Sequence, residues 1–323
     1  MRSKQRSATV ALGAGGARGV AHLGAIEELQ RGGFTIERYV GVSIGSLAGA
    51  LAALGKDIEE VQDQAVAYLS SPEFQRHQAR FATTSASSEE RIEESAFLSW
   101  YNRLSDYWNA NRLLTRLFRR PGILSGLIME EVVDQLLPDI DISETATPLS
   151  IVAADLRSGR RVVLDRGPLR AAVRGSAAIP GIFPPVEFEG MLLSDIGGLD
   201  SLAVSVARTF KPSFIVAVDV GTEMLPVSDM STSMGVLRRM DQIGEALFRE
   251  QCDCDADLIV RPKVGHIDWF AFDRAEALIE AGRAATVAAL DNRHKRNLWN
   301  NLLYSRGPVR DQSRAAVDPA ESR

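Results

Sequence analysis

The sequence predicts an α/β fold with three layers, in which a mostly parallel central sheet lies between helices. Short apolar runs alternate along the chain with segments of helical periodicity. Parallel strands need such an alternation, because a helix must carry the chain back between them. The chain has 323 residues, of which 45% are hydrophobic and 24% charged. This composition is ordinary for a large globular domain and excludes a mainly disordered, collagenous or coiled-coil chain.

The first elements follow from local periodicity. The short apolar run Ala8–Leu12 ends in glycines, as a buried strand does. Gly19–Gln30 carries its aliphatic residues on one stripe and is followed by Arg31-Gly32-Gly33, which is typical of an amphipathic helix and its end. Tyr39–Val42 predicts a second strand, and Gly45–Leu54 predicts a helix of small residues. The sequence of the N-terminal part therefore predicts two consecutive strand–helix units.

The later part repeats this alternation. Strands are expected at Leu149–Asp155, Arg161–Leu164, Met191–Ser194, Phe214–Val220 and Asp257–Val260. Helices are expected at Leu169–Ala178, Val204–Phe210 and Asp273–Leu290. We expect one domain over residues 8–305, between a disordered N-terminus (residues 1–7) and a polar, disordered tail (residues 306–323).

Residues 71–121 interrupt the pattern. A stretch rich in Ser, Thr and Glu is followed by aromatic residues at helical spacing and then by arginines. One interpretation is a helix that packs its aromatic face on the core. The other is a lid beside the active site, since aromatic and arginine side chains together suit a membrane surface.

Charge, cysteine content and hydropathy narrow the function classes. A formal net charge of −5 gives no support for nucleic-acid binding. Cys252 and Cys254 cannot build a disulfide framework, which favours a reducing compartment. No apolar run approaches the roughly 18 residues of a membrane-spanning helix. We therefore expect a cytoplasmic protein whose membrane contact would be peripheral, at the inner membrane surface.

A glycine-rich loop, Gly13-Ala14-Gly15-Gly16-Ala17-Arg18-Gly19, joins the first predicted strand to the first predicted helix. Dense glycine lets backbone N–H groups turn toward one point, so the loop predicts an anion site, either a phosphate cradle or an oxyanion hole. The dinucleotide fingerprint fails because its sixth position is Arg18, and the lysine of a P-loop is absent. Arg18 is expected to help hold the loop or an anion.

The stretch Gly41-Val42-Ser43-Ile44-Gly45 matches the G-x-S-x-G pattern at a strand-to-helix turn. In that pattern the serine is a nucleophile, and Gly41 and Gly45 are needed because the turn is crowded. The serine and the glycine-rich loop follow successive strands, which places both at one carboxyl edge if the strands are parallel neighbours. A nucleophile facing N–H donors is what acyl transfer requires.

The base for Ser43 has two candidates. Asp195 follows the predicted strand Met191–Ser194 and is therefore expected at the same carboxyl edge. A carboxylate can serve as the base if the site is dry and the oxyanion hole lowers much of the barrier. The alternative is an α/β-hydrolase triad of Ser43, Asp195 and His266, which has the right chain order. No metal site is predicted.

Four ordered stretches resemble the patatin-like phospholipase family, in its bacterial branch related to neuropathy target esterase. They are Gly15–Gly19 with Ala21-His22-Leu23-Gly24, Gly41–Ser46, Arg174–Pro180 with Phe183-Pro184-Pro185, and Asp195-Ile196-Gly197. The resemblance covers roughly residues 8–220. It implies a patatin-like three-layer fold.

The resemblance also implies a chemistry. Ser43 would be the nucleophile and Asp195 the base of a dyad without histidine, and the oxyanion donors would come from Gly15, Gly16, Ala17, Arg18 and Gly19. The implied substrates are fatty-acyl esters of phospholipids, lysophospholipids and other lipids, with no cofactor or metal. The sequence leaves the oligomeric state open.

The chain departs from the family pattern at two positions. Ile196 stands where the pattern has glycine, and Ala203 stands where proline is common. A β-branched residue would be costly if that backbone had a positive φ, and it would move Asp195. This departure motivates a further alternative, a non-catalytic lipid-binding or regulatory protein on the same scaffold.

Overall fold

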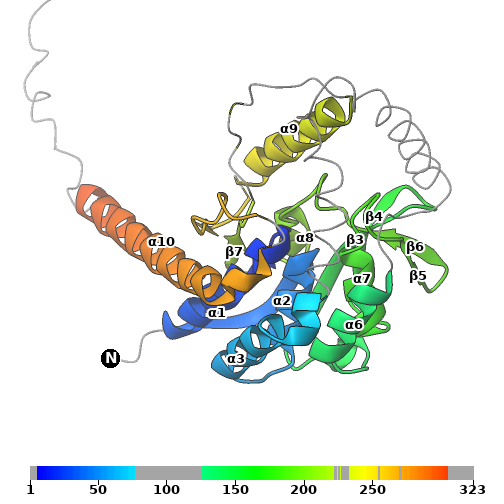
Figure 1. Ribbon diagram of the computed structural model, residues 1–323. Helices are drawn as coiled ribbons and strands as arrows, with labels where there is room; N and C mark the ends of the chain where they lie inside the picture. Colours follow the sequence, from blue (N-terminus) through cyan, green and yellow to red (C-terminus); the bar gives the residue numbers. More distant parts are fainter. Residues whose placement is uncertain are drawn as a thin grey trace, which may run out of the picture.

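The computed structural model describes residues 6–76, 126–221, 224, 226, 233–253, 255–268 and 271–304 (Figure 1). Its strands are β1 (Arg6–Leu12), β2 (Phe34–Val42), β3 (Leu149–Asp155), β4 (Arg160–Leu164), β5 (Val186–Phe188), β6 (Met191–Ser194), β7 (Ile215–Val218) and β8 (Leu258–Val260). Its α-helices are α1 (Ala21–Arg31), α2 (Ile44–Ala53), α3 (Ile58–Leu69), α6 (Gly126–Leu136), α7 (Leu169–Ser176), α8 (Val204–Thr209), α9 (Ser233–Asp253) and α10 (Ala275–Tyr304). Short 3₁₀ helices are η1 (Gly16–Val20), η2 (Ile142–Glu144) and η3 (Phe272–Arg274).

The described strands form one sheet in the order β5-β6-β3-β2-β1-β7-β8, with β4 beside β3. β1 lies at the centre and pairs in parallel with β2 and β7, while β3 and β8 continue the parallel part on either side. β4 and β6 run antiparallel to β3, and β5 runs antiparallel to β6. The predicted α/β class with a mostly parallel sheet is confirmed.

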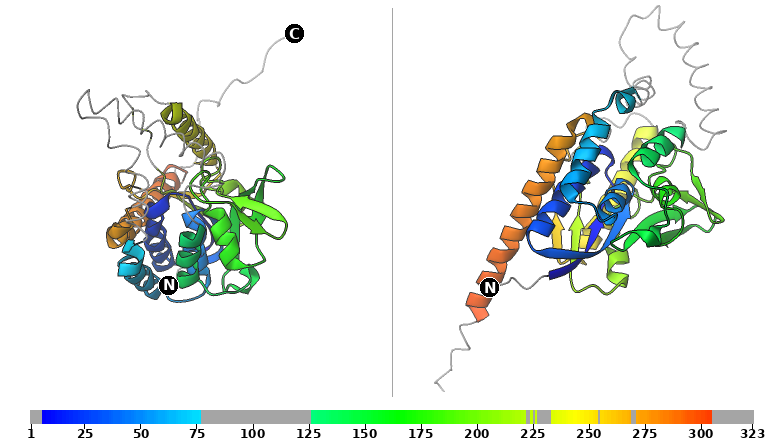
Figure 2. Two further views of the ribbon diagram at one scale, coloured as in Figure 1. Left: turned by 45° about the vertical axis from the view of Figure 1, so that its right-hand side comes forward. Right: turned by 90° about the horizontal axis from the view of Figure 1, so that it is seen from below.

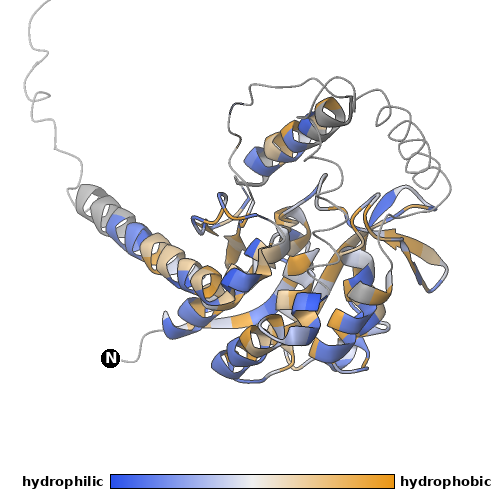
Figure 3. Cartoon of the chain, viewed as in Figure 1, coloured by the Kyte–Doolittle hydropathy of each residue, from blue (hydrophilic) through white to orange (hydrophobic). Residues whose placement is uncertain are grey.

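The helices cover the two faces of the sheet unequally. Alternate side chains of β1, Val10 and Leu12, enter a large core with α1, α2, α3, α6, α7 and α10. Ala11 points to the other face, where α8 supplies Val204 and Val206. Figure 2 shows α1, α3 and α10 side by side on one side of the sheet, and Figure 3 shows hydrophobic residues where helices meet strands. The structure thus has the three predicted layers, one of them thin.

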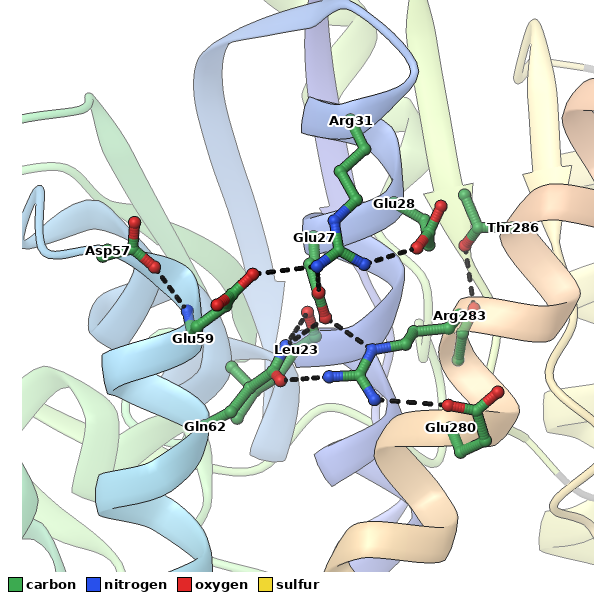
Figure 4. Close-up of polar contacts among 11 residues, drawn as sticks. Leu23, Glu27, Glu28, Arg31, Asp57, Glu59, Gln62, Glu280, Arg283 and Thr286 are labelled. Carbon is green, nitrogen blue, oxygen red and sulfur yellow. Dashed lines mark hydrogen bonds and ion pairs between the residues drawn. The ribbon is translucent and has the colours of Figure 1, made fainter.

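A buried ionic network ties three helices of the large layer together (Figure 4). Glu27 of α1 is buried and accepts hydrogen bonds from Arg283 Nε of α10 at 2.6 Å and from Gln62 Nε2 of α3 at 2.8 Å. Arg31 Nη2 lies 2.5 Å from the other oxygen of the same carboxylate. Since Arg283 Nη2 also donates to Gln62 at 2.6 Å, each buried polar group of the network has partners from another helix.

Several boundaries differ from the sequence prediction. β1 begins at Arg6 because Arg6 and Ser7 pair with Phe34 and Thr35 of a longer β2. α10 runs to Tyr304, past the expected end at Leu290. The helices α3, α6 and α9 and the strand β5 were not predicted.

Some predictions cannot be placed. From residue 77 onward, the insertion expected at residues 71–121 lies outside the described residues, as do residues 1–5 and the tail from residue 305. Among the helices that are described, none combines the length and the apolar character needed to cross a membrane.

Candidate active site

Ser43 occupies a strained turn directly after β2. Its backbone has φ 55° and ψ −126°, a left-handed conformation that is unfavourable for a residue with a side chain. Its N–H donates to Ser176 Oγ at 2.9 Å, and its carbonyl accepts from the N–H and hydroxyl of Ser46 at 2.8 and 2.6 Å. Ser176 Oγ donates in turn to Val152 O of β3 at 2.7 Å. The strained conformation is therefore held from both sides.

Gly41 and Gly45 are required by close backbone approach at this turn. A Cβ atom on Gly41 would lie 2.5 Å from Gly45 O, and one on Gly45 would lie 2.1 Å from Leu12 O of β1. Both separations are shorter than non-bonded atoms tolerate, and both meet rigid backbone. The two predicted glycines thus let α2 begin directly against the end of β1.

Asp195 lies beside Ser43, where the sequence placed it, but not for the expected reason. Val42 pairs with Val152, and Ser194 pairs with Ala154, so Ser43 and Asp195 both come level with Ala153. β6 is antiparallel to β3, so its first residues lie beyond the carboxyl end of β3 and its last residues lie beside that end. The expectation that Asp195 follows a strand running with the others was wrong, because apolar periodicity does not give strand direction.

The carboxylate of Asp195 contacts the serine directly. It accepts a hydrogen bond from the Ser43 hydroxyl and another from the Gly197 N–H, the latter at 2.7 Å. Its own N–H donates to Ala178 O at 2.9 Å. Burial raises the pKa of Asp195 to about 6, outweighing the lowering effect of these two hydrogen bonds, and the nearby charge of Glu245 adds to the rise. Asp195 is therefore a stronger base than a solvated aspartate and is still ionised at neutral pH.

The glycine-rich loop runs alongside the serine turn. Because Leu12 pairs with Gly41, the residues after β1 lie next to those after β2. The loop is fixed by hydrogen bonds from the Gly13 N–H to Val218 O at 3.1 Å and from the Ala14 N–H to Ser201 O at 2.8 Å. A Cβ on Gly19 would lie 2.3 Å from Ile44 Cγ2, which shows how closely η1 packs on the residue after Ser43.

Helix η1 supplies candidate oxyanion donors. Gly16, its first residue, has φ 59°, a conformation that glycine adopts without strain. The first N–H groups of a helix have no acceptor inside it, and in η1 these belong to Gly16 and Ala17. Arg18 Nε donates to Gly15 O at 3.0 Å. Burial lowers the pKa of Arg18, and its side chain braces the loop from within.

The three histidines that the structure describes take no part in the contact between Ser43 and Asp195. His22 is fully buried in α1, and its ring donates through Nε2 to Gly13 O at 2.8 Å, so it supports the glycine-rich loop. Burial lowers the pKa of His22 to about 4, which keeps the ring neutral. His266 is exposed after β8, three strands away from β2. Within the described residues no hydrogen bond or ion pair links His266 to Ser43 or Asp195. His294 is exposed on α10, and His77 lies outside the described residues.

Ile196 is accommodated without backbone strain. It is absent from the positive-φ residues of the described chain, and its side chain is buried with Val42 and Val152 beneath the serine turn. The strained residue of this segment is Ala203, with φ 47°. Its N–H donates to Asp200 Oδ1 at 3.0 Å. The substitution at position 196 therefore leaves Asp195 in contact with Ser43.

Sequence reasoning missed two polar supports of the site. Ser176 lies within the quoted stretch Arg174–Pro180, but its hydrogen bond to Ser43 depends on α7 packing behind β2 and β3. Glu245 comes from α9, a helix that was not predicted, and the charge of its carboxylate raises the pKa of Asp195. Neither role has a local signature in the sequence.

Comparison with known proteins decides the family. The model of the family described as patatin-like phospholipase matches residues 10–207, a range that includes Ser43, the glycine-rich loop and Asp195. The chain belongs to the patatin-like phospholipase family. The predicted resemblance is therefore confirmed, and with it the patatin-like fold.

Patatin-like relatives include largely uncharacterised proteins. An NTE-family protein of Mycobacterium tuberculosis is 31% identical over 242 residues, covering 74% of this chain and 57% of the relative. A second one from the same species is 28% identical over 309 residues and is covered over 46% of its length, so the chain spans about half of these relatives. Neuropathy target esterase of Drosophila melanogaster is 26% identical over 214 residues, which are 66% of this chain and 13% of that protein. Among solved structures, VipD of Legionella pneumophila is similar with a TM-score of 0.41 and 14% identity, over 90% of this chain and 67% of that one.

Proposed function

We propose that the protein is a serine hydrolase of fatty-acyl esters, of the phospholipase A or lysophospholipase type, in which Ser43 and Asp195 form a catalytic dyad. The observation that carries this proposal is the hydrogen bond from the Ser43 hydroxyl to a partly buried Asp195, beside the N–H groups that begin η1. Family membership supports the reaction class.

The acyl transfer would proceed in two steps. Asp195 accepts the proton of Ser43 as Oγ attacks the ester carbonyl carbon, and the oxygen that becomes negative is stabilised by the N–H groups of Gly16 and Ala17. The tetrahedral intermediate then expels the alcohol, which takes the proton from Asp195 and leaves acyl-Ser43. In the second step Asp195 takes a proton from water as its oxygen attacks the acyl group, and the fatty acid leaves as Ser43 regains a proton.

Contact with a lipid surface is supported by α9. Val236, Met240 and Leu247 are spaced by four and seven residues, so they share one face of the helix, and they are 45%, 61% and 58% exposed. Leu199, four residues after Asp195, is also exposed. Exposed apolar side chains near an acyl-ester site suit a lipid aggregate. The segment expected to serve this purpose, residues 91–120, lies outside the described residues. We place the protein in the cytoplasm, with peripheral contact at the inner membrane surface.

The test is a panel of lipid esters assayed with the wild type, Ser43→Ala, Asp195→Asn and His266→Gln. We expect Ser43→Ala and Asp195→Asn to lose all detectable turnover, and His266→Gln to retain wild-type activity. A fluorophosphonate probe should label the wild type and leave Ser43→Ala unlabelled. Loss of activity in His266→Gln would instead favour the triad.

The alternative of a non-catalytic lipid-binding protein was motivated by strain at Ile196. Since the backbone there is unstrained, that motivation falls away. A folded wild type that neither hydrolyses any ester nor reacts with the probe would restore this alternative.

A further inference from the structure

A cluster of charged residues lies on the side of the glycine-rich loop away from Asp195. Its centre is Asp219, which directly follows β7 and comes level with Gly13, because Leu12 pairs with Val218. The buried Asp219 carboxylate accepts from the Gly221 N–H at 3.0 Å and pairs with Arg261 Nε at 3.1 Å. Arg249 Nη1, from α9, lies 3.5 Å from Asp219 Oδ1. The cluster therefore attaches α9 to the edge of the sheet that carries the active site.

Glu245, one turn before Arg249 on α9, links this cluster to the loop itself. Its carboxylate lies 3.8 Å from Arg249 Nη1 and accepts a hydrogen bond from the hydroxyl of the buried Ser201. The carbonyl of Ser201 accepts from the Ala14 N–H at 2.8 Å. The chain of contacts thus runs from Glu245 through Ser201 to Ala14, two residues before the candidate oxyanion donor Gly16.

The groups that surround Glu245 come from its own helix and from three other segments. Arg249 lies on the same helix, Arg18 on η1 and Asp219 after β7, while Ser201 belongs to the segment after Asp195. Burial raises the pKa of Glu245, whereas Arg249, the Ser201 hydroxyl and Arg18 favour its ionised form. The same carboxylate also disfavours the ionised form of Asp195.

Simple helix attachment does not explain the choice of Glu245. The Arg249–Asp219 pair already attaches α9 to the sheet, and the apolar stripe of α9 faces the opposite side of the helix. A carboxylate placed near the catalytic carboxylate opposes attachment electrostatically, because like charges repel. This arrangement is typical of active sites, where a base is strengthened by a nearby negative charge.

We propose that Glu245 is a positioning residue of the active site, which holds Ser201, and through Ser201 the glycine-rich loop, from the neighbouring helix α9. The inference rests on the proposed Ser43–Asp195 dyad. It adds a residue that lies beyond the range matched by the family, residues 10–207.

The test compares Glu245→Gln with the wild type on a soluble short-chain ester, measuring kcat/KM across the acidic range. Glutamine keeps an acceptor for Ser201 and removes the charge. We expect the acidic limb of kcat/KM to move to lower pH by about half a unit, with a fall of about two- to threefold at the plateau, because Asp195 becomes a weaker base. Glu250→Gln, an exposed position on the same helix, is the matched control and should change neither quantity.

A second variant separates the charge from the contact. Ser201→Ala removes the hydrogen bond to Glu245 and leaves its charge, so it should lower kcat/KM several-fold without moving the acidic limb downward. Folding of Glu245→Gln is checked by circular dichroism and a thermal melt. If that variant does not fold, Ser201→Ala still tests the inference. An unchanged acidic limb in folded Glu245→Gln, or unchanged kcat/KM in Ser201→Ala, would overturn the inference. An inactive, unlabelled wild type would instead refute the dyad on which it rests.

Discussion

At the scale of single residues, Asp195 combines a hydrogen bond to Ser43 with a pKa raised to about 6 by burial. An ionised aspartate can accept the Ser43 proton, and a protonated one cannot. The hydrogen bonds from Ser43 and Gly197 keep the ionised form accessible at neutral pH.

We therefore predict that kcat/KM falls as pH drops through about 6, the pKa of Asp195. The same shift affects stability. The folded state holds the Asp195 proton more tightly than the unfolded state, so stability falls as pH rises from the unfolded pKa of the carboxyl to its folded value of about 6, and the full cost of the ionised carboxylate persists above that value. Asp195→Asn should consequently melt at a higher temperature than the wild type at neutral pH, and this gain should shrink in acid.

Thermal melts of the two proteins at several pH values, together with the pH profile of the wild type, check this prediction. Asp255→Asn is a suitable control, because that aspartate is exposed and remote from Ser43. An Asp195→Asn variant that melts below the wild type at neutral pH would contradict the prediction.

The sequence predicted the residues of the site whose role is local. The left-handed turn at Ser43 requires Gly41 and Gly45, and a short pattern records that requirement. The glycine-rich loop could be predicted for the same reason, because its backbone conformation also depends on residues within a short stretch of sequence. Ser176 and Glu245 were not predicted, because each acts through a contact that exists only once distant helices pack around the turn.

At the scale of secondary-structure elements, α1, α3 and α10 are joined by the network around Glu27 (Figure 4). Burial pushes the pKa of Glu27 up, but the hydrogen bonds from Gln62 and Arg283 and the charges of Arg283 and Arg31 outweigh it, so the pKa lies below its ordinary value. The network therefore stabilises the fold above the unfolded pKa of the carboxyl, and this contribution is lost as pH falls through the lowered folded value.

We predict that Glu27→Gln lowers the free energy of unfolding by about 1–3 kcal/mol, because it removes the charge that two arginines share, while both arginines can still reach water. The loss should be largest near neutral pH and smaller in acid. Glu280→Gln, which removes an exposed partner of the same Arg283, should cost about 0.5 kcal/mol or less. Urea unfolding of both variants measures the difference, and equal losses would contradict a special role for Glu27.

Element boundaries show what periodicity can and cannot predict. β3 and β6 were predicted to the residue, since each is a short apolar run with clear ends. The direction of β6 was not predicted, because successive side chains point to opposite faces of the sheet whichever way a strand runs. α3 was missed although its apolar residues recur at helical spacing after the N-cap Asp57, whose side chain accepts from the Glu59 N–H. That signal was present in the sequence.

At the scale of the whole molecule, α9 has two different faces. Glu245 and Arg249 contact the edge of the sheet that holds Ser43, while Val236, Met240 and Leu247 face solvent. Polar contact inward and apolar exposure outward reverse the usual pattern of a surface helix. The long helix α10 packs on α1 (Figure 1) and carries an exposed apolar residue of its own, Val287.

We predict that the double substitution Met240→Ser and Leu247→Ser lowers hydrolysis of phospholipid vesicles at least several-fold and leaves hydrolysis of a soluble short-chain ester unchanged. The reason is that the exposed stripe contributes to binding the lipid surface and takes no part in acyl transfer. Vesicle co-sedimentation and the two hydrolysis rates measure the effect. Val287→Ser is the matched control. Parallel loss on both substrates would show that the stripe serves the fold rather than the surface.

The position of β1 between β2 and β7 has a consequence for the synthesis of the protein. Ser43 leaves the ribosome with β2, whereas Asp195 and the strand that completes the centre of the sheet follow about 150 residues later. At translation rates of about 5–20 residues per second, that interval lasts roughly 8–30 s. Throughout it the nucleophile lacks its base, and the glycine-rich loop lacks Val218 and Ser201, which hold it. If Ser43 and Asp195 form the proposed dyad, a nascent chain therefore cannot cleave an ester bond of a nearby membrane before these later segments have been made.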